Sequence, residues 1–386
     1  MGEWIGHGRK ARRAYGFDEI AIVPGEVTIN PNEVDIHWEL AGRRHELPII
    51  AAAMDGVVSP DFAIAMGRMG GLAILNLEGV WFRYDDPSDI LREISESTPD
   101  RATELVQQLY LPPVREDLVS RRVEQVKAAG VPVIVSAIPQ KADRGAALCE
   151  EAGCDIFVVQ STVSTVRHIS SEYKMLDIGQ LCRSTKMAVM VGNCVTYATA
   201  LELMEAGPAA VIIGIGPGAA CTSRGVLGIG VPQVTATVDG AAARDEHFKR
   251  TGRRVPVITD GGMSVGGDIC KAFASGADAV IVGSAFAKAS EAPGRGFHWG
   301  MATPHANLPR GTRIRVGTSG TLEEILFGPA RLDDGSQNLV GALRTCMGSV
   351  GATNLKDLQN AELVIAPAIK TEGKIFQAAQ KIGMGK

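Results

Sequence analysis

The stretch VPVITDGGMSVGGDICKAFASGADAVIVGS, residues 255–284, decides the fold because it contains one complete strand–helix–strand unit. Its first run, 255–262, and its last, 278–284, are short, apolar and β-branched, and each is bounded by glycine or polar residues, as buried parallel strands are. The part between them, 265–276, has apolar residues at helical spacing and ends in glycine, a common helix stop. Because parallel strands need such a crossover, the stretch predicts a βαβ unit.

The same alternation runs along most of the chain. Further stretches at 59–70, 115–130 and 197–207 have the pattern of crossover helices. Eight parallel strands that alternate with helices predict a closed (β/α)8 TIM barrel, one catalytic domain spanning residues 1–386. The eight predicted strands are 47–54, 72–78, 131–138, 155–161, 188–193, 209–216, 255–262 and 278–284.

Two stretches are too long to be simple connections. Residues 79–113 form a short insertion after the second strand, and residues 289–320 follow the eighth strand as a candidate active-site flap, with a C-terminal loop extension beyond them. Connections longer than about 15 residues are usually functional or mobile. We therefore expect both segments to lie near the site.

Composition and charge narrow the class of function. The formal net charge is −4, from 39 basic and 43 acidic residues that are mixed along the chain, so no electrostatic footprint for nucleic acid or an anionic membrane is expected. No apolar run reaches the roughly 18 residues of a membrane span, and no secretory signal pattern is present. The seven cysteines lack C-x-x-C spacing. We expect a reduced, cytoplasmic protein that acts on small molecules.

The ends of the last two predicted strands carry residues suited to a nucleotide. Barrel enzymes bind their ligands at the carboxyl ends of the strands, and Gly261, Gly262 and Gly283 with Ser284 stand there. Glycine lets a phosphate approach the backbone N–H groups closely. Asp260 would repel a phosphate but can accept hydrogen bonds from two ribose hydroxyls. These residues predict a ribose phosphate site; the alternative is turn glycines without a ligand.

A lone cysteine follows the sixth predicted strand, in GIGPGAACTSR at 214–224. Cys221 is a candidate nucleophile because the backbone dipoles of a glycine-rich loop favour the thiolate. The other six cysteines are expected to be small buried apolar residues. Carbonyl groups of the same loop, at Gly216, Gly218 and Cys221, are candidate ligands for a monovalent cation.

Metal catalysis and a Rossmann fold are not expected. His168, His298 and His305 fall in or near predicted loops without the i, i+4 spacing of a helical zinc motif. Glycine patterns here do not follow a first strand with a downstream acid, as a dinucleotide-binding fold requires.

The chain resembles the IMP dehydrogenase and GMP reductase family over nearly its whole length. Nine motifs carry the resemblance in one order: YGFDEIAIVPG (15–25), AAAMDGV (51–57), GNCVT (192–196), GIGPGAACTSR (214–224), VPQVTA (231–236), TDGG (259–262), GADAVIVGS (276–284), EAPG (291–294) and NLVGALRTCMGSVGA (338–352).

The resemblance implies a (β/α)8 barrel, usually a homotetramer and in some cases an octamer, in which a loop cysteine adds to C2 of GMP or IMP. A nicotinamide cofactor, NADPH or alternatively NADH/NAD, exchanges hydride there, and K⁺ is a further expected ligand. Cys221 matches the catalytic cysteine, and Ser223 takes the place of a loop threonine implicated in proton transfer. By motif position the nucleotide-binding residues are Met54, Asn193, Asp260, Gly261, Gly262, Gly283, Ser284, Gly300, Met301 and Ala302, and the cofactor-binding residues are Gln160, Ser161 and Thr162.

Several departures from the family pattern bear on the reaction. The paired regulatory CBS module of many dehydrogenases, inserted after the second strand, is replaced by about thirty-five residues. The flap is shortened and lacks the Arg-Tyr pair whose arginine activates water in dehydrogenases. Gln160 stands where a cofactor-contacting aspartate is usual, Ala219 replaces a phosphate-contacting serine, and Arg310 replaces an acidic or amide residue.

Both reactions of the family share one covalent intermediate. Its hydrolysis gives XMP in the dehydrogenase, whereas the reductase forms it from GMP with loss of ammonia and reduces it to IMP. A chain without the usual water activator favours GMP reductase from sequence alone, with IMP dehydrogenase as the alternative. A nucleotide-binding regulator without turnover is disfavoured by the intact CTSR motif.

Overall fold

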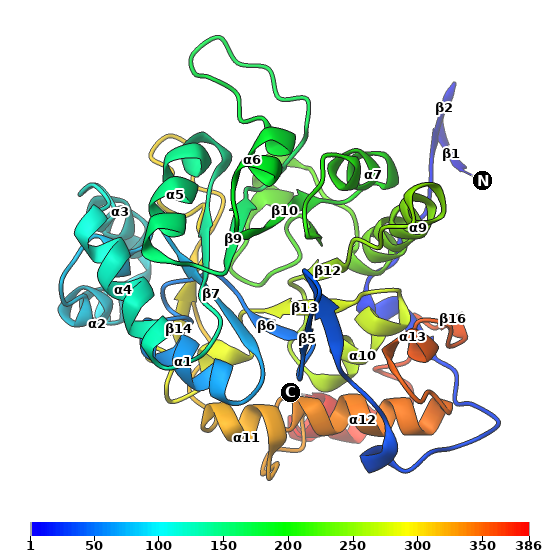
Figure 1. The fold of residues 1–386 in the computed structure, drawn as a ribbon. Coiled ribbons are helices and arrows are strands. Elements are labelled where there is room, and N and C mark those ends of the chain that lie inside the picture. The colour runs from blue at the N-terminus through cyan, green and yellow to red at the C-terminus, as the bar shows by residue number, and fades with distance from the viewer. Residues whose placement is uncertain (1, 386) are drawn as a thin grey trace.

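The computed structural model of the protein describes residues 2–385 and is built on a closed barrel of eight parallel strands (Figure 1). Around the barrel the order is β10-β11-β12-β13-β6-β7-β8-β9. The last barrel strand, β13, therefore pairs with the first barrel strand, β6, and closes the barrel. Each predicted run contains one strand, which confirms the TIM barrel. The strands are β6 (Ile49–Ala51), β7 (Leu72–Asn76), β8 (Ile134–Ala137), β9 (Ile156–Gln160), β10 (Ala188–Cys194), β11 (Ala210–Ile213), β12 (Val257–Asp260) and β13 (Ala279–Val282).

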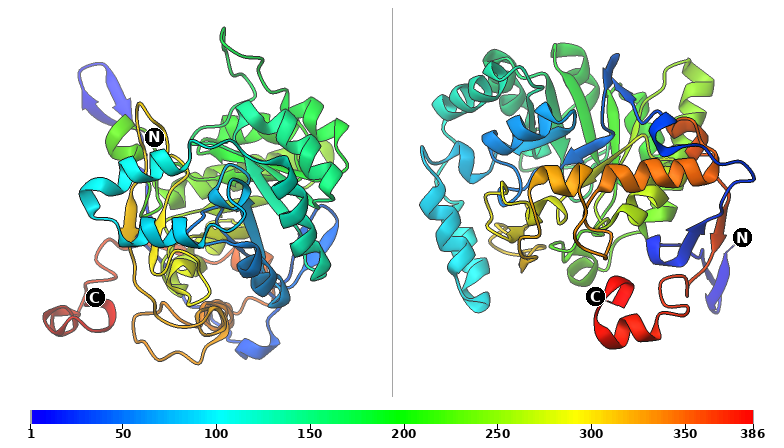
Figure 2. Two further views of the ribbon diagram at one scale, coloured as in Figure 1. Left: turned by 90° about the vertical axis from the view of Figure 1, so that its left-hand side faces the viewer. Right: turned by 90° about the horizontal axis from the view of Figure 1, so that it is seen from below.

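Helices cover the outside of the barrel (Figures 1 and 2). The strands are apolar on both faces because one face fills the barrel interior and the other packs on these helices. The four predicted crossover helices are confirmed as α1, α4, α7 and α10. The main helices are α1 (Pro60–Arg68), α4 (Glu116–Ala128), α5 (Pro139–Ala152), α6 (Ile178–Ser184), α7 (Tyr197–Glu205), α9 (Gln233–Thr251), α10 (Gly266–Ala274), α11 (Leu322–Phe327), α12 (Leu339–Val350) and α13 (Leu355–Leu358).

The segment 79–113 contains a 3₁₀ turn, η3 (Val80–Phe82), and two helices, α2 (Ser88–Glu96) and α3 (Pro99–Leu109). The connection from β7 to β8 consists of these elements and α4. No paired regulatory module therefore lies between these two strands. The segment 289–320 contains an antiparallel pair, β14 (Phe297–Trp299) and β15 (Arg313–Arg315).

These two distant segments pack on each other. Trp299 is 2% exposed and shares a small core with Val80, Leu91, Ile94 and Val106. The Arg313 guanidinium reaches across to α2 and donates hydrogen bonds to the carbonyl groups of Ile94, Ser95 and Ser97 at 2.6–2.9 Å. The segment 289–320 is therefore anchored to the insertion.

A buried polar network joins the same two segments to the barrel. The Tyr110 hydroxyl donates to the Asp55 carboxylate, which also accepts from the Val80 N–H at 3.1 Å, and Trp299 Nε1 donates to the Tyr110 hydroxyl at 2.8 Å. Burial raises the pKa of Asp55 to about 6, although these donors act in the opposite direction.

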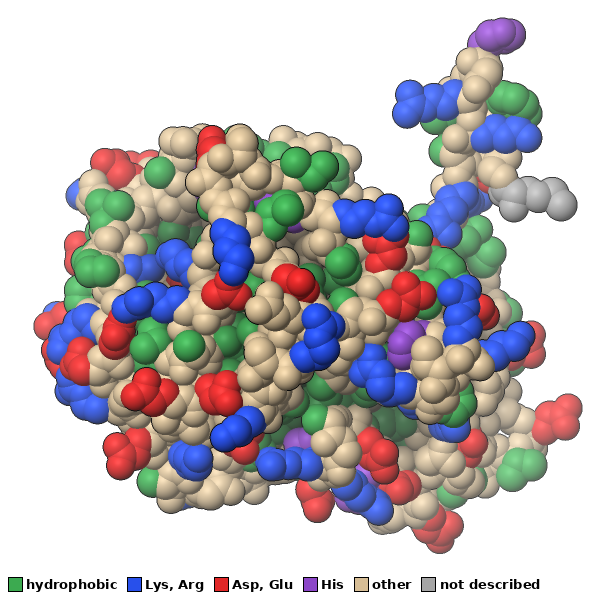
Figure 3. All heavy atoms as spheres, turned by 45° about the horizontal axis from the view of Figure 1, so that its top comes forward, with side chains coloured by type: hydrophobic (Ala, Val, Ile, Leu, Met, Phe, Trp, Pro, Cys, Tyr) green, Lys and Arg blue, Asp and Glu red, His purple; other side chains and the backbone are tan. Residues whose placement is uncertain are grey.

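Other parts of the chain lie at the periphery. The hairpin β1 (Glu3–Gly6) and β2 (Arg9–Ala11) projects away from the barrel, as does α14 (Ile375–Gln380) near the other terminus (Figures 1 and 2). Acidic and basic side chains intermingle over the face drawn in Figure 3. Among the described residues, no helix has both the length and the hydropathy to cross a bilayer.

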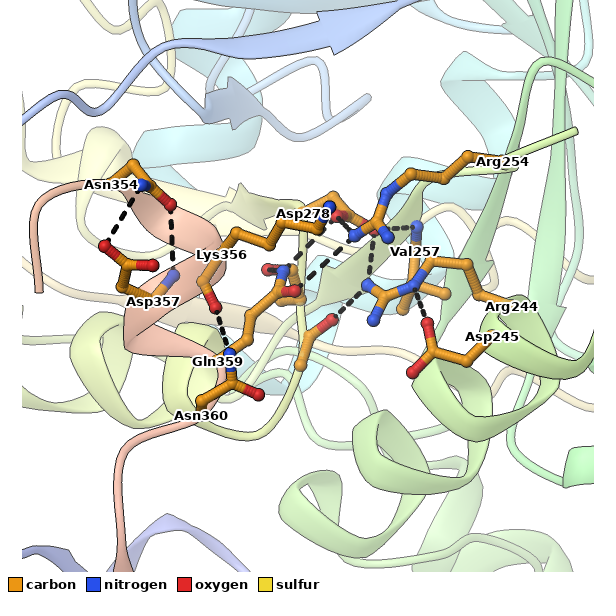
Figure 4. Close-up of polar contacts among 12 residues, drawn as sticks. Arg244, Asp245, Arg254, Val257, Asp278, Asn354, Lys356, Asp357, Gln359 and Asn360 are labelled. Atoms are coloured by element: carbon orange, nitrogen blue, oxygen red, sulfur yellow. Dashed lines mark hydrogen bonds and ion pairs between the residues drawn. The ribbon is translucent and has the colours of Figure 1, made fainter. Parts of the chain in front are cut away.

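A buried ion cluster holds the amino-terminal end of the last two strands (Figure 4). The Asp278 carboxylate, just before β13, accepts from Arg244 and Arg254, both at 2.7 Å, and from the Val257 N–H at 2.8 Å. Gln359, which follows α13, donates to the same carboxylate at 3.2 Å. Burial alone would raise the pKa of Asp278, but the two guanidinium groups lower it below its usual value. The cluster thus ties the C-terminal region to the barrel.

We expect Asp278→Ala to lower the free energy of unfolding by about 3–5 kcal/mol, because it leaves two guanidinium groups without their shared carboxylate. Equilibrium unfolding in urea measures this change. Asp245→Ala is the matched control: its exposed carboxylate contacts the same Arg244 and should contribute less than about 1 kcal/mol. Because the folded-state pKa of Asp278 is lowered, its contribution is present above about pH 4 and is lost as the pH falls through the folded-state value. Equal effects of the two substitutions would contradict this account.

Candidate active site

A cleft with a volume of about 880 Å³ opens at the carboxyl ends of the barrel strands. All but one of the residues predicted from sequence line this single cleft. They are Met54, Gln160, Ser161, Thr162, Asn193, Gly216, Gly218, Cys221, Asp260, Gly261, Gly262, Gly283, Ser284, Gly300, Met301 and Ala302. The exception is Ser223.

The loop that carries Cys221 is held by the segment after β14. Cys221 bridges Gly311 in antiparallel fashion, the Thr222 N–H donates to the Arg310 carbonyl at 3.0 Å, and the Thr312 N–H donates to the Ala220 carbonyl at 2.8 Å. The Cys221 Sγ lies 3.7 Å from the same Arg310 carbonyl oxygen. The thiol is therefore fixed at the point where the two segments meet.

Cys221 differs from the other cysteines in its surroundings. It is partly exposed and lines the cleft, whereas burial raises the pKa of Cys194 to about 12 and that of Cys182 to about 11. Such buried thiols stay protonated at neutral pH and are poor nucleophiles. Cys221 is thus the thiol that a ligand in the cleft can reach.

The loop that carries Cys221 requires glycine at position 214 because its backbone approaches the end of β12 closely. Gly214 has a φ of +147°, and a Cβ there would lie 2.3 Å from the Asp260 carbonyl oxygen. Any other residue would push the Cys221 loop away from the end of β12. The predicted cation ligands Gly216, Gly218 and Cys221 lie in this loop, where the Gly218 carbonyl already accepts from the Cys221 N–H at 3.0 Å; a cation site stays a prediction.

Ser223 does not reach the cleft. It is fully buried at the start of α8 (Ser223–Leu227), and its Oγ lies 3.3 Å from the Cys221 Sγ. Sequence order placed it near the nucleophile but gave no sign of its burial. In this structure Ser223 can influence a ligand only through the thiol.

Asp260 is positioned by two amide side chains. Asn193 Nδ2 donates to its Oδ2 at 2.7 Å, and Gln160 Nε2 donates to the same oxygen at 3.1 Å. This arrangement leaves the other carboxylate oxygen for a ligand. Burial raises the pKa of Asp260 to about 6, and the two amide donors partly offset that rise. Asp260 is therefore ionised above about pH 7.

The glycine-rich strand ends form another part of the cleft lining, next to the loop that carries Cys221. Gly261 and Gly262 have φ of +83° and +80°, a region that favours glycine, and Pro217 lies within about 3.2 Å of a Cβ built at either. The Ser284 hydroxyl lies 3.0 Å from Nε2 of His298. His298 lines the cleft, although the sequence pattern gave it no role there.

The cleft continues past Gln160 over the ends of β7 and β8. This part is lined by Glu78, Arg83, Tyr110 and Lys141, none of which was predicted as a site residue. Lys141 pairs with Glu78 at 2.5 Å, and Arg83 donates to the Glu78 carbonyl at 3.0 Å. Arg83 and Tyr110 come from the segment 79–113, whose contacts with the barrel are not visible in the sequence.

Comparison with known proteins agrees with this geometry. The family model described as "IMP dehydrogenase / GMP reductase domain" matches residues 14–374. The chain belongs to this family. It is therefore an oxidoreductase of the IMP dehydrogenase / GMP reductase family, whose members act on nucleotides of the IMP and GMP type with nicotinamide cofactors.

Two relatives and one solved structure illustrate the similarity. It is 39% identical to an uncharacterized oxidoreductase of Mycolicibacterium smegmatis, over 94% of this chain and 99% of the relative. It is 25% identical to an inosine-5'-monophosphate dehydrogenase of Methanocaldococcus jannaschii, over 94% and 95%. The crystal structure of an IMP dehydrogenase/GMP reductase-like protein from Corynebacterium glutamicum superposes with a TM-score of 0.89 at 34% identity, covering 94% of this chain and 96% of that one.

For this family member we expect Cys221→Ser to abolish turnover while nucleotide affinity stays within about tenfold, because the hydroxyl is a far weaker nucleophile of similar size. Cys182→Ser, which alters a half-buried thiol on α6, is the matched control and should remain active. Steady-state rates and calorimetric titrations provide the two readouts. Turnover by the Cys221 variant would rule out the covalent mechanism.

Asp260→Ala should weaken IMP and GMP alike by roughly ten to a few hundredfold, since loss of the carboxylate leaves ribose hydroxyls unpaired. The titration is best made at pH 8, where the wild-type carboxylate is ionised. Unchanged affinity for both nucleotides would show that the ribose lies elsewhere.

Proposed function

We propose that this protein is an IMP dehydrogenase that oxidises IMP to XMP through a covalent intermediate on Cys221. The observation that carries this proposal is the position of Arg310, whose carbonyl accepts from the Thr222 N–H and lies 3.7 Å from the Cys221 Sγ, and which lines the same cleft. Cys221, Asp260 and the glycine-rich strand ends match the nucleophile, the ribose site and the phosphate site of one bound nucleotide.

The nucleotide is positioned by groups that surround the barrel mouth. The 5'-phosphate lies against Gly262, Gly283 and Ser284, and the ribose hydroxyls donate to Asp260. The Asn193 and Gln160 amides hold that carboxylate in place. This arrangement directs the purine toward Cys221, which the close approach of Gly214 to β12 brings near the ribose site.

The reaction then has two parts. The Cys221 thiolate adds to C2 of the purine, and the hydrogen at C2 leaves with its electron pair, so that a thioimidate remains. Water adds to C2 of this species, loses a proton, and expels the thiolate to give XMP. A nicotinamide cofactor, when bound, accepts the hydride.

Residues on the far side of the cleft fit such a cofactor. Arg83 provides positive charge for a pyrophosphate, and Lys141, which is paired with Glu78, lies in the same part of the cleft. Gln160 Oε1 is buried without a hydrogen-bond partner among the described residues, and a carboxamide N–H of a ligand would satisfy it. Gln160, Ser161 and Thr162 line the same cleft, and the family pattern implies cofactor contacts for them.

A cation in the cleft that Cys221 lines would favour attack by water, and Arg310 lines that cleft. A guanidinium stays cationic at neutral pH, so Arg310 would stabilise an attacking water as it acquires hydroxide character. The same cation would disfavour a leaving amine as it acquires a positive charge. Arg310 Nε is buried without a hydrogen-bond partner in the described part of the chain, and a water admitted next to it would satisfy this donor.

GMP reductase is the second candidate, in which NADPH converts GMP to IMP and ammonia. It is favoured by the short segment between β14 and β15, which lacks the Arg-Tyr pair of dehydrogenase flaps. It requires a proton for the departing ammonia, and the predicted donor, Ser223, is fully buried behind Cys221. The surroundings of Cys221 thus support the reductase less well.

Product analysis decides between the two reactions. Purified protein is given IMP with NAD, and separately GMP with NADPH, and the nucleotides are separated by chromatography. We expect a higher catalytic efficiency for XMP formation from IMP than for IMP formation from GMP. The opposite order would establish the reductase and overturn the dehydrogenase proposal.

Arg310→Ala should slow hydrolysis by about 10² to 10³, the usual cost of removing one group that stabilises developing negative charge, while hydride transfer remains rapid. IMP and NAD should then give a burst of NADH followed by slow turnover, with a nucleotide adduct on Cys221 detectable by intact-protein mass spectrometry. Arg315→Ala, on the exposed end of β15, is the matched control and should turn over normally. A variant of Arg310 with wild-type turnover would exclude this role.

A further inference from the structure

A histidine lies next to the residues that are proposed to bind the 5'-phosphate. These residues, Gly262, Gly283 and Ser284, are called the phosphate wall below. His298, in the middle of β14, is 2% exposed and yet lines the cleft. Its Nε2 lies 3.0 Å from the Ser284 hydroxyl, which belongs to the wall, and its Nδ1 is buried without a hydrogen-bond partner among the described residues. A buried polar atom without a partner costs about 1–3 kcal/mol, so such an arrangement invites a functional explanation.

The phosphate end of the cleft has no other cation. Its lining comes from 52–54, 261–263, 283–284 and 300–302, and none of these residues is lysine or arginine. Arg83 and Lys141 line the far part of the cleft, and Arg310 belongs to the segment whose backbone pairs with the Cys221 loop. A phosphate monoester carries about −1.5 to −2 charges at pH 7. His298 is therefore the one ionisable base in the described residues that stands against this end.

The free protein keeps His298 neutral at physiological pH. Burial lowers its pKa to about 4, and burial alone accounts for the shift. The charged groups on the elements packed around it are engaged elsewhere or at least partly exposed. Arg313 donates to carbonyls of α2, and Asp55 accepts from Tyr110 and Val80. Arg315 is exposed at the end of β15, and Lys288 is half-buried at the end of η4 (Phe286–Lys288).

We propose that His298 takes up a proton when a nucleotide 5'-phosphate binds, and so becomes the cation of the phosphate site. This inference rests on the proposed nucleotide site but holds for IMP and GMP alike. The proton comes from solvent. The imidazolium Nε2–H donates to Ser284 Oγ, and the Ser284 hydroxyl donates its own hydrogen to a phosphate oxygen.

Protonation of His298 on binding would make nucleotide affinity depend on pH in a definite direction. Because the bound anion raises the pKa of His298 above its free value, nucleotide affinity includes a contribution that is lost as the pH rises through the bound-state value. The second ionisation of the phosphate itself, near pH 6, acts in the opposite direction. Comparison of the wild-type protein with a His298 variant at each pH separates the two effects.

Calorimetric titration with IMP at pH 7.5, in two buffers with different heats of ionisation, measures this proton directly. The wild-type protein should take up a fraction of a proton, on the order of one if the bound-state pKa lies well above 7.5. His298→Asn should abolish the uptake and weaken IMP roughly tenfold to a hundredfold, as expected for loss of a charge-assisted hydrogen bond.

Three controls make the test specific. Inosine lacks the phosphate, so its affinity should be the same for wild-type and His298→Asn protein. His305→Gln alters another histidine that lines the cleft and should keep the proton uptake. Ser284→Ala keeps the imidazole but removes its link to the phosphate, and it should reduce the uptake even if the His298 variant proves unstable.

Unchanged proton uptake in both the His298 and the Ser284 variants would overturn the inference while leaving the proposed function intact. An equal loss of inosine and IMP affinity would assign His298 a purely structural role. If neither IMP nor GMP binds the wild-type protein, the proposed nucleotide site itself is wrong and the inference falls with it.

Discussion

Two backbone hydrogen bonds between the Cys221 loop and residues 310–312 determine most of what this site can do. They join the Thr222 N–H to the Arg310 carbonyl and the Thr312 N–H to the Ala220 carbonyl. Through them the Cys221 loop, which follows β11, is fixed to a segment that comes after the last strand of the barrel. The pairing sets the position of the Arg310 backbone beside the thiol, and in the proposed reaction the side chain of that residue supplies charge to the covalent intermediate.

The segment that carries Arg310 is itself anchored. Trp299 is buried against the insertion, Arg313 binds three carbonyl groups of that insertion, and Tyr110 links both to Asp55 at the end of β6. Because these contacts hold the segment at several points, it is already ordered before a ligand binds. This lowers the entropy cost of ligand binding. The segment 289–320, which the sequence comparison with dehydrogenases describes as a shortened flap, is thus held in one position on one side of the cleft.

The sequence predicted those features of the fold and the site that depend on residues adjacent along the chain. The eight strands could be predicted because each is a short β-branched run, and most of the site could be predicted because a parallel barrel brings its strand ends to one mouth. Arg83, Tyr110 and Lys141 were missed because their position depends on how the insertion and α5 pack around the mouth. His298 was considered only as a metal ligand. The burial of Ser223, which bears on the choice of reaction, depends on the turn into α8 and has no local signature.

A crystal structure of the wild-type protein with IMP bound would test the central claim most directly. We predict that the phosphate contacts Gly262 and Ser284, the ribose contacts Asp260, and C2 of the purine lies within about 3.5 Å of the Cys221 Sγ, the range for reacting atoms. The Arg310 guanidinium should then face C2 from the side where water must approach. A purine whose C2 points away from Cys221, or an Arg310 side chain turned out of the cleft, would contradict the account.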